Sequence, residues 1–436
     1  MKLEDGSWLT GQSAARRGLP VVWGLAPVCG RRMGRVGVRE AMVLVIVLAW
    51  LALGVPAQFS AGAAPAEPAG ASSSAGFAVD LNYQETDEVL VSRPIGIRIQ
   101  MATFRKEPAL DRRNVIRGVL PWGTRSEQAI PFIWEKGQGR LYLDLNRNRD
   151  LTDDAKGVLD SASRANSQSF TNIHLVLPTA SGDRPVRLRL TFTSYGAGGV
   201  NVQAGLCSYW QTKISPRGNE WQFGLVEELL AENGSLPPQW MLLRAWAERQ
   251  RPFNLLSASP DFCGITKNVF FDNRAYGLDF HYETGGDAPK YKVTLKEQTL
   301  PLGELTVTGA NLHRLILGAP TWMTLLLDRP AGTMKVPAGS YSVDEIWLRK
   351  GEVEVVRLGA GRVTVDPERA ATLVAGGPLT NSVEVKDDPY GLYIRYKLVG
   401  ADGGAYKLPR PDYEHPPEFA VFQGTNRVAT DKFQYG

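Results

Sequence analysis

From residue 77 onward, apolar and polar side chains alternate along many short segments. In the clearest segment Val186, Leu188, Leu190 and Phe192 alternate with arginine and threonine. Successive side chains of a strand point to opposite faces, so this pattern predicts strands with one face buried and one in water. The same alternation predicts strands within residues 95–101, 172–177, 269–283, 291–297, 304–309, 333–337, 341–348, 352–358, 362–365, 381–385 and 392–400.

Turn-forming residues separate these segments and indicate the fold class. Glycine, proline, asparagine and aspartate recur between them; Asp272-Asn273-Arg274 predicts a hairpin turn, and Gly424-Thr425-Asn426 predicts another between two closing strands. Many short strands spaced by turns are typical of sandwiches and barrels. We therefore predict an all-β protein with two or three β-sandwich or open-barrel domains.

One region departs from this pattern. Residues 225–250 are rich in leucine, glutamate and alanine, and Trp240, Leu243 and Ala247 share one face of a helix. Gly234 and the two prolines that follow it would divide the region into two stretches. The composition predicts a short helical insertion between β-domains.

These patterns predict an organisation for all 436 residues. The predicted segments are a signal peptide with a long n-region at 1–57, a flexible linker at 58–76, a β-domain with an acidic loop at 77–215, a partly helical insertion at 216–260, a β-sandwich at 261–375, and C-terminal strands or a small immunoglobulin-like domain at 376–436.

The N-terminal prediction rests on an apolar run at residues 41–55, which follows four arginines and precedes small residues. This order is typical of a secretory signal, and the run is shorter than the ~20 residues that span a bilayer comfortably. Met33 or Met42 as the true start would shorten the long n-region. The alternative is an uncleaved anchor, in which case the protein would be held at a membrane.

The net charge of +4 lies entirely in residues 1–60, which hold seven basic and three acidic side chains. The remaining chain has equal numbers of basic and acidic residues, 42 of each. A neutral folded part gives no electrostatic reason to bind nucleic acid, so nucleic acid is excluded as an expected partner.

A cluster of oxygen-bearing side chains follows one predicted strand directly. Oxygen ligands at every second position suit a hard cation such as calcium, which takes several oxygens at once. We therefore predict a calcium site, and its candidate ligands are Asp144, Asn146, Asn148, Asp150, Thr152, Asp153 and Asp154. The alternative is a strand end at which Asn and Asp residues form turns without an ion.

The spacing of this cluster resembles degenerate EF-hand loops of the dockerin or thrombospondin type-3 kind. Asp144 would be the first position of such a loop, and calcium ligation is what the resemblance implies. Three features differ from the family pattern. Arg149 occupies the sixth position, where glycine is expected; Ala155 occupies the twelfth, where an acid is expected; and the preceding residues predict a strand. Asp153 or Asp154 could supply the missing acid.

A second resemblance lies near residue 340. Pro337-Ala338-Gly339 precedes an alternating segment that begins at Tyr341. Proline cannot pair in a ladder and glycine accepts unusual φ, so a strand is expected to begin after these three residues. This order resembles the strand entry of prealbumin-like and carboxypeptidase-regulatory-like sandwiches. The whole chain also resembles large uncharacterised secreted β-rich bacterial proteins, a resemblance that implies no particular activity.

Two other residue types leave alternatives open. Cys207 and Cys263 are the cysteines beyond the leader, and they could form one disulfide in an oxidising compartment or remain two buried thiols. A set of tryptophans could form a sugar-binding platform or belong to the core. This set is Trp210, Trp221, Trp240, Trp246, Trp322 and Trp347.

No catalytic motif is present: the chain has no G-x-S-x-G elbow, P-loop or dinucleotide fingerprint, and its four histidines are scattered. We therefore expect a secreted or periplasmic, non-catalytic binding or structural protein of the cell envelope, stabilised by calcium. Its expected partner is an envelope polysaccharide or protein. Two alternatives are an extracytoplasmic hydrolase acting on carbohydrate or peptide, with carboxylates from distant strands, and a membrane-anchored accessory protein.

Overall fold

The computed structural model describes residues 76–99, 102–111, 114–123, 128–195, 199–230, 234–250, 259–285, 288–388, 391–409 and 413–433. The predicted signal peptide, and the predicted linker up to residue 75, lie outside these residues. The described residues contain no α-helix, and 3-10 turns such as η2 (Ala155–Gly157) and η3 (Trp246–Glu248) are short. The prediction of an all-β, multi-domain fold is confirmed.

The chain divides into two compact units. The described part of the smaller unit comes from residues 381–398 and 412–436. It contains β26 (Thr380–Asp388) paired with β27 (Gly391–Val399), and β29 (Glu418–Gln423) paired with β30 (Asn426–Lys432). The last pair closes around the predicted turn at Gly424, so the prediction of two closing strands is confirmed.

The described part of the larger unit lies within residues 71–380 and 399–411, and its largest sheet has 13 strands. In spatial order they are β14 (Phe262–Gly264), β13 (Pro238–Ala245), β12 (Trp221–Glu227), β11 (Ser208–Ile214), β1 (Phe77–Glu85), β17 (Lys290–Gln298), β16 (Arg274–Glu283), β15 (Asn268–Phe271), β20 (Met323–Asp328), β19 (Leu312–Ala319), β22 (Gly339–Lys350) and β23 (Val353–Leu358), with β24 (Arg362–Val365) beside β22. Because β1 pairs with both β11 and β17, strands before and after residue 216 share one sheet.

Smaller sheets complete this unit. One has the order β2 (Val91–Ile95), β10 (Gly199–Leu206), β9 (Gly182–Tyr195), β8 (Ser167–Thr179). A second has the order β3 (Arg98–Ile99), β4 (Val115–Leu120), β5 (Ile130–Glu135), β6 (Arg140–Leu143), β7 (Val158–Asp160). A third has the order β21 (Gly332–Pro337), β18 (Leu302–Thr308), β25 (Ala371–Val374). The two-residue strand β28 (Ala405–Tyr406) precedes Lys407, which bridges to Val356 of β23.

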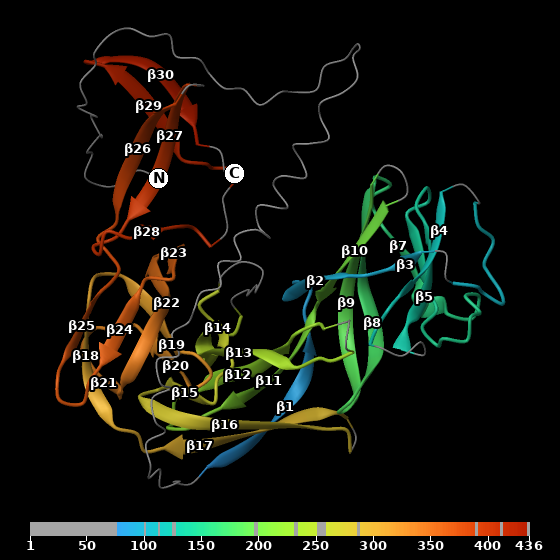
Figure 1. Ribbon diagram of the computed structural model, residues 1–436, viewed down its shortest axis with the longest axis horizontal. Helices are drawn as coiled ribbons and strands as arrows, with labels where there is room; N and C mark the ends of the chain where they lie inside the picture. The colour runs from blue at the N-terminus through green and yellow to red at the C-terminus, as the bar shows by residue number, and fades with distance from the viewer. Residues whose placement is uncertain are drawn as a thin grey trace. The chain divides into compact units, whose positions relative to one another are not determined.

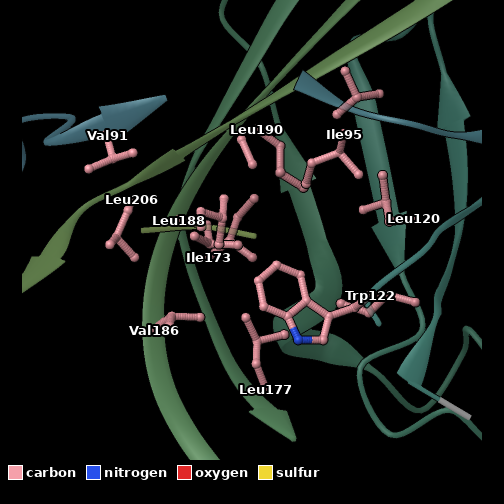
Figure 2. Packing of buried hydrophobic residues seen from close by; sticks show 14 of the residues in the cluster. Val91, Ile95, Leu120, Trp122, Ile173, Leu177, Val186, Leu188, Leu190 and Leu206 are labelled. Atoms are coloured by element: carbon pink, nitrogen blue, oxygen red, sulfur yellow. The ribbon is translucent and has the colours of Figure 1, made fainter. Parts of the chain in front are cut away.

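The five-stranded sheet (β3 to β7) and the four-stranded sheet (β2, β10, β9, β8) pack face to face as a sandwich (Figure 1). The predicted alternation on β9 is confirmed, because Val186, Leu188, Leu190 and Phe192 are each at most 3% exposed. Figure 2 shows three of these residues with others of the shared core. The five-stranded sheet contributes Phe132, Trp134, Leu141 and Leu143 to the same core.

The other face of the five-stranded sheet carries a smaller core. Ile133 and Tyr142 alternate with residues of the main core along β5 and β6, so they point to the opposite side. There they form a cluster with Leu151, which lies in the predicted acidic loop. The loop is therefore attached to a sheet whose strands β5 and β6 are buried on both faces.

The predicted helical insertion is wrong. Residues 221–227 and 238–245 form the strands β12 and β13, which pair with each other in the large sheet. Met241 and Leu243 are buried in the core of the large sheet, whereas Leu242 is buried in the sandwich core. Since both faces of β13 are covered by apolar groups, its sequence lacks the alternation by which a strand is recognised.

Other local predictions can be compared directly. The turn at Asp272 and Asn273 joins β15 to β16 as predicted, and both residues have the positive φ, 50° and 59°, that a tight hairpin needs. Pro337 ends β21 and the next strand begins at Gly339, one residue earlier than the proline-alanine-glycine order predicted. Whether this segment belongs to a prealbumin-like family stays a prediction.

The open alternatives for cysteine and tryptophan are now resolved in part. Cys207 and Cys263 are both free and buried, so no disulfide joins them. Burial raises the pKa of the Cys263 thiol to about 12 and also raises the pKa of Cys207. Trp210, Trp221 and Trp347 are core residues, at 0%, 8% and 0% exposed. The other three, Trp240, Trp246 and Trp322, are half-buried.

Glu345 on β22 gives the fold a pH dependence. Burial raises its pKa from 4.5 to about 7, even though Trp347 Nε1 donates a hydrogen bond to it at 2.6 Å. Asp344 raises the pKa further and Arg314 opposes the shift. Because the folded-state pKa lies above the unfolded one, the contribution to stability is complete below pH 4.5 and is lost as pH rises through about 7.

We expect the free energy of unfolding to fall by about 3 kcal/mol across this window because of Glu345. Urea unfolding at pH values from about 4.5 to 8 measures the fall. Glu345→Gln mimics the protonated carboxyl and should remove that part of the slope, whereas Glu304→Gln on the exposed side of β18 should retain it. An unchanged slope in Glu345→Gln would contradict the prediction.

Candidate metal centre

The acidic loop begins where β6 ends and runs to the turn η2. The strand predicted before it is therefore present. Asp144 still continues the sheet ladder, because its N–H donates to the Pro131 carbonyl at 2.9 Å. Leu151 anchors the middle of the loop in the small core, at 2% exposed. The loop is thus fixed to the sheet at its start and at its centre.

The side chains of Asn146, Asn148 and Asp150, at every second position of the loop, accept hydrogen bonds from the loop backbone. Asn146 Oδ1 accepts the N–H of Asn148 at 2.9 Å, and Asn148 Oδ1 accepts the N–H of Asp150 at 2.6 Å. Asp150 Oδ1 in turn accepts the N–H of Thr152 at 2.9 Å. These bonds are the turns that short polar side chains form without an ion, so they do not by themselves indicate a metal.

Two carboxylates of the loop are buried and incompletely paired. Asp144 is 0% exposed and Asp154 is 8% exposed. Oδ2 of Asp144 accepts the N–H of Arg149 at 3.0 Å, but its Oδ1 has no hydrogen-bond partner among the described residues. Oδ2 of Asp154 also has none. A buried acceptor without a partner costs about 1–3 kcal/mol, and more when it is charged.

The charges of these carboxylates act on each other. Burial raises the pKa of Asp144. Hydrogen bonds from backbone N–H groups lower this pKa, and the negative charge of Asp153 raises it further. Burial also raises the pKa of Asp154, and the charges of Asp144 and Asp153 raise it further. Within the part of the chain that the structure describes, neither Asp144 nor Asp154 has an ion pair. The two buried carboxylates are therefore not neutralised by an ion pair of their own among the described residues.

The other predicted ligands take different positions. Asp153 is exposed, and its two oxygens accept the amide groups of Asn146 and Asn148 at 3.2 and 2.7 Å, so it orients these side chains. The Asp150 carboxylate accepts the Thr152 hydroxyl at 2.5 Å and lies 4.0 Å from Lys106 Nζ. The side chains of Asp150, Thr152 and Asp153 are thus engaged with protein groups.

The departures from the EF-hand pattern have local counterparts in the structure. Arg149, at the position of the expected glycine, has a φ of 65°, the left-handed conformation that a glycine adopts readily. Arg147 also has a positive φ, 59°. Such conformations cost a non-glycine residue roughly 1–3 kcal/mol and persist where the surroundings enforce them. The acid missing from residue 155 has a buried counterpart in Asp154.

Glu227 is a buried carboxylate outside the loop, the kind of group that could act in catalysis. Glu227 is 2% exposed, and burial raises its pKa. Its oxygens accept hydrogen bonds from Arg184, Trp210 and Tyr291 at 2.9–3.0 Å. A carboxylate whose oxygens are already bonded on three sides has a structural role. It links the large sheet, through β12, to β9 of the sandwich.

The described residues therefore define an all-β protein in which an acidic loop follows β6 of the five-stranded sheet, and this sheet contributes to a core on each of its faces. Comparison with protein-family models, curated proteins and solved structures found no match to this chain. No helix in the described residues has the length and apolarity needed to cross a membrane. No three histidine, cysteine, aspartate or glutamate side chains converge as a metal-binding group within the described ranges, so a site at this loop would need amide and carbonyl oxygens as well.

Proposed function

We propose that this protein is a secreted, non-catalytic binding or structural protein of the cell envelope whose five-stranded sheet is stabilised by calcium. The observation that carries the proposal is the pair of buried oxygens, Asp144 Oδ1 and Asp154 Oδ2, that have no hydrogen-bond partner in the described part of the chain. A divalent cation between them would satisfy both oxygens and balance their charge. The expected partner is a polysaccharide or protein of the envelope.

The donor chemistry favours calcium over other metals. The loop that holds the two carboxylates also carries the side-chain amide oxygens of Asn146 and Asn148, and calcium binds six to eight oxygens in flexible geometry. Oδ1 of Asn146 and of Asn148 each accept one N–H, which leaves a second lone pair for a cation. Magnesium requires a tighter octahedral shell, and zinc prefers nitrogen and sulfur.

The predicted location outside the cytoplasm is one where calcium is available to the protein. The apolar run at residues 41–55 with its basic flank supports export from the cytoplasm. Extracellular calcium modules bind with dissociation constants on the order of 10⁻⁴ to 10⁻³ M, so a site with two buried carboxylates suits that environment. The ion would stabilise the loop by offsetting the repulsion between the carboxylates of Asp144 and Asp154.

Calcium is expected to raise the free energy of unfolding by about 2.7 kcal/mol at a hundredfold excess over its dissociation constant. Thermal unfolding followed by circular dichroism measures this, with about 10 mM calcium against a chelator and against about 10 mM magnesium, which should act less. This calcium concentration is about a hundredfold excess if the dissociation constant is about 10⁻⁴ M, and about a tenfold excess, worth about 1.4 kcal/mol, if it is about 10⁻³ M. Asp154→Asn should abolish the calcium effect. In chelator it should be at least as stable as the parent, because it removes a buried charge that has no ion pair among the described residues.

The matched control is Asp160→Asn on β7, whose exposed carboxylate pairs with Arg140 outside the loop. It should retain the full calcium effect. An equal calcium effect in Asp154→Asn, or none in the parent protein, would contradict the calcium site.

A further inference from the structure

Residues 102–111 lie across the acidic loop, and we call this segment the strap. The strap contacts the loop through backbone hydrogen bonds. The N–H groups of Arg105 and Lys106 donate to the Arg149 carbonyl at 2.8 and 3.4 Å, and the N–H of Leu151 donates to the Lys106 carbonyl at 3.1 Å. These bonds pair Lys106 with Asp150 in a parallel bridge. The loop therefore supplies the backbone partners of the middle of the strap.

Side chains add to this attachment. Phe104 and Leu110 pack against the small core that contains Leu151. Glu107 and Arg117 of β4 form a double hydrogen bond at 2.9 and 2.6 Å. The Glu107 pair is partly exposed and so contributes little, whereas the apolar contacts depend on where Leu151 lies. Displacement of the loop would thus loosen the strap at both its backbone and its apolar contacts.

The residues that hold the strap are also residues of the candidate metal centre. In the parallel bridge, the carbonyl of Arg149 and the N–H of Leu151 face the strap. The N–H and carbonyl of Asp150 between them therefore face away from the strap, because alternate peptide groups of an extended chain point to opposite sides. The Asp150 N–H donates accordingly to Asn148 Oδ1 inside the loop. Three consecutive residues thus join the strap on one side to the loop interior on the other.

We propose that calcium occupancy controls the docking of the strap, and with it the access of proteases to the Lys106–Glu107 peptide bond. This inference rests on the proposed calcium site. With the ion bound, residues 149–151 are held and the strap stays paired. Without it, repulsion between Asp144 and Asp154 loosens the same residues and releases the strap. The Lys106 side chain is already 65% exposed, so the paired backbone is what withholds the segment from cleavage.

The test is limited proteolysis of the full chain by a lysine-specific endoprotease, with fragments identified by mass spectrometry. At a calcium concentration well above the dissociation constant, cleavage after Lys106 should be at least about tenfold slower than in chelator, because cleavage follows the population of the open strap. Cleavage after Lys350, at the exposed β22–β23 hairpin, is the internal reference and should not change.

Two further measurements separate this inference from the calcium site itself. Calorimetric titration with calcium reports binding directly. Phe104→Ala should speed cleavage in calcium and, because coupling between two sites is reciprocal, should also weaken calcium binding. If calcium binds but cleavage after Lys106 is equally fast in calcium and in chelator, control of the strap is wrong and the site remains. If calcium does not bind, the proposed function itself fails.

Discussion

Replacement of Glu227 by alanine is expected to lower the free energy of unfolding by about 3–5 kcal/mol. The substitution would leave the Arg184 guanidinium buried without its counter-charge, 5% exposed and only 3.2 Å above the ring of Tyr282. Trp210 Nε1 and the Tyr291 hydroxyl would lose their acceptor at the same time. The cost comes mainly from these stranded groups rather than from the value of the ion pair itself.

Urea unfolding followed by tryptophan fluorescence measures this loss. Glu283→Ala on β16 is the matched control, because its pair with Lys292 is partly exposed and should cost at most about 1 kcal/mol. Changing both Arg184 and Glu227 to methionine should cost less than Glu227→Ala, since no unpaired charge remains buried. A loss in Glu227→Ala no larger than in Glu283→Ala would refute a structural role for this cluster.

Strand positions could be predicted where one face of the strand meets water. On β9 the exposed arginines and threonines mark the face opposite Val186 and Phe192, so the alternation survives in the sequence. On β12 and β13 it does not survive. Phe223 and Leu225 face one core and Val226 faces the other, which leaves a continuous apolar run. The helix-forming residues in that run then outweigh the strand signal, although packing on both faces decides the structure.

The acidic loop could be located from its spacing, but its internal geometry could not. Nothing in the sequence distinguishes Asp154, which is buried, from Asp153, which is exposed. The positive φ of Arg147 and Arg149 has no sequence signal, because arginine rarely adopts it. The strap pairs with the loop across more than forty residues of chain, and a single parallel bridge leaves no pattern that could be recognised beforehand.

The buried cluster around Glu227 could not be predicted from the sequence either. Its members Arg184, Trp210, Glu227 and Tyr291 belong to four different strands. One signal was present: Glu227 and Glu228 interrupt an apolar run, and acidic residues are rarely buried unless they are paired. That signal indicates a buried partner without saying which arginine supplies it.

Replacement of Phe192 by alanine is expected to lower the free energy of unfolding by about 3–5 kcal/mol as well. Phe192 is 0% exposed, and its ring lies 5.2 Å from the rings of both Phe132 and Trp134 and 5.9 Å from that of Phe170. Its removal would leave a cavity where the two sheets of the sandwich meet. Tyr195→Ala on the same strand is the control, because that ring is 59% exposed and its loss should change stability by about 0.5 kcal/mol or less.

Phe192→Ala also tests whether packing and ion binding are separate sources of stability. The cavity would open on the sandwich face of the five-stranded sheet, whereas Leu151 anchors the acidic loop on the opposite face. Effects of sites without shared partners usually add within about 0.5 kcal/mol. The variant should therefore be less stable than the parent in chelator but gain the same free energy from calcium. A reduced gain, measured by urea unfolding with and without calcium, would mean that the sandwich core positions Asp144 and Asp154.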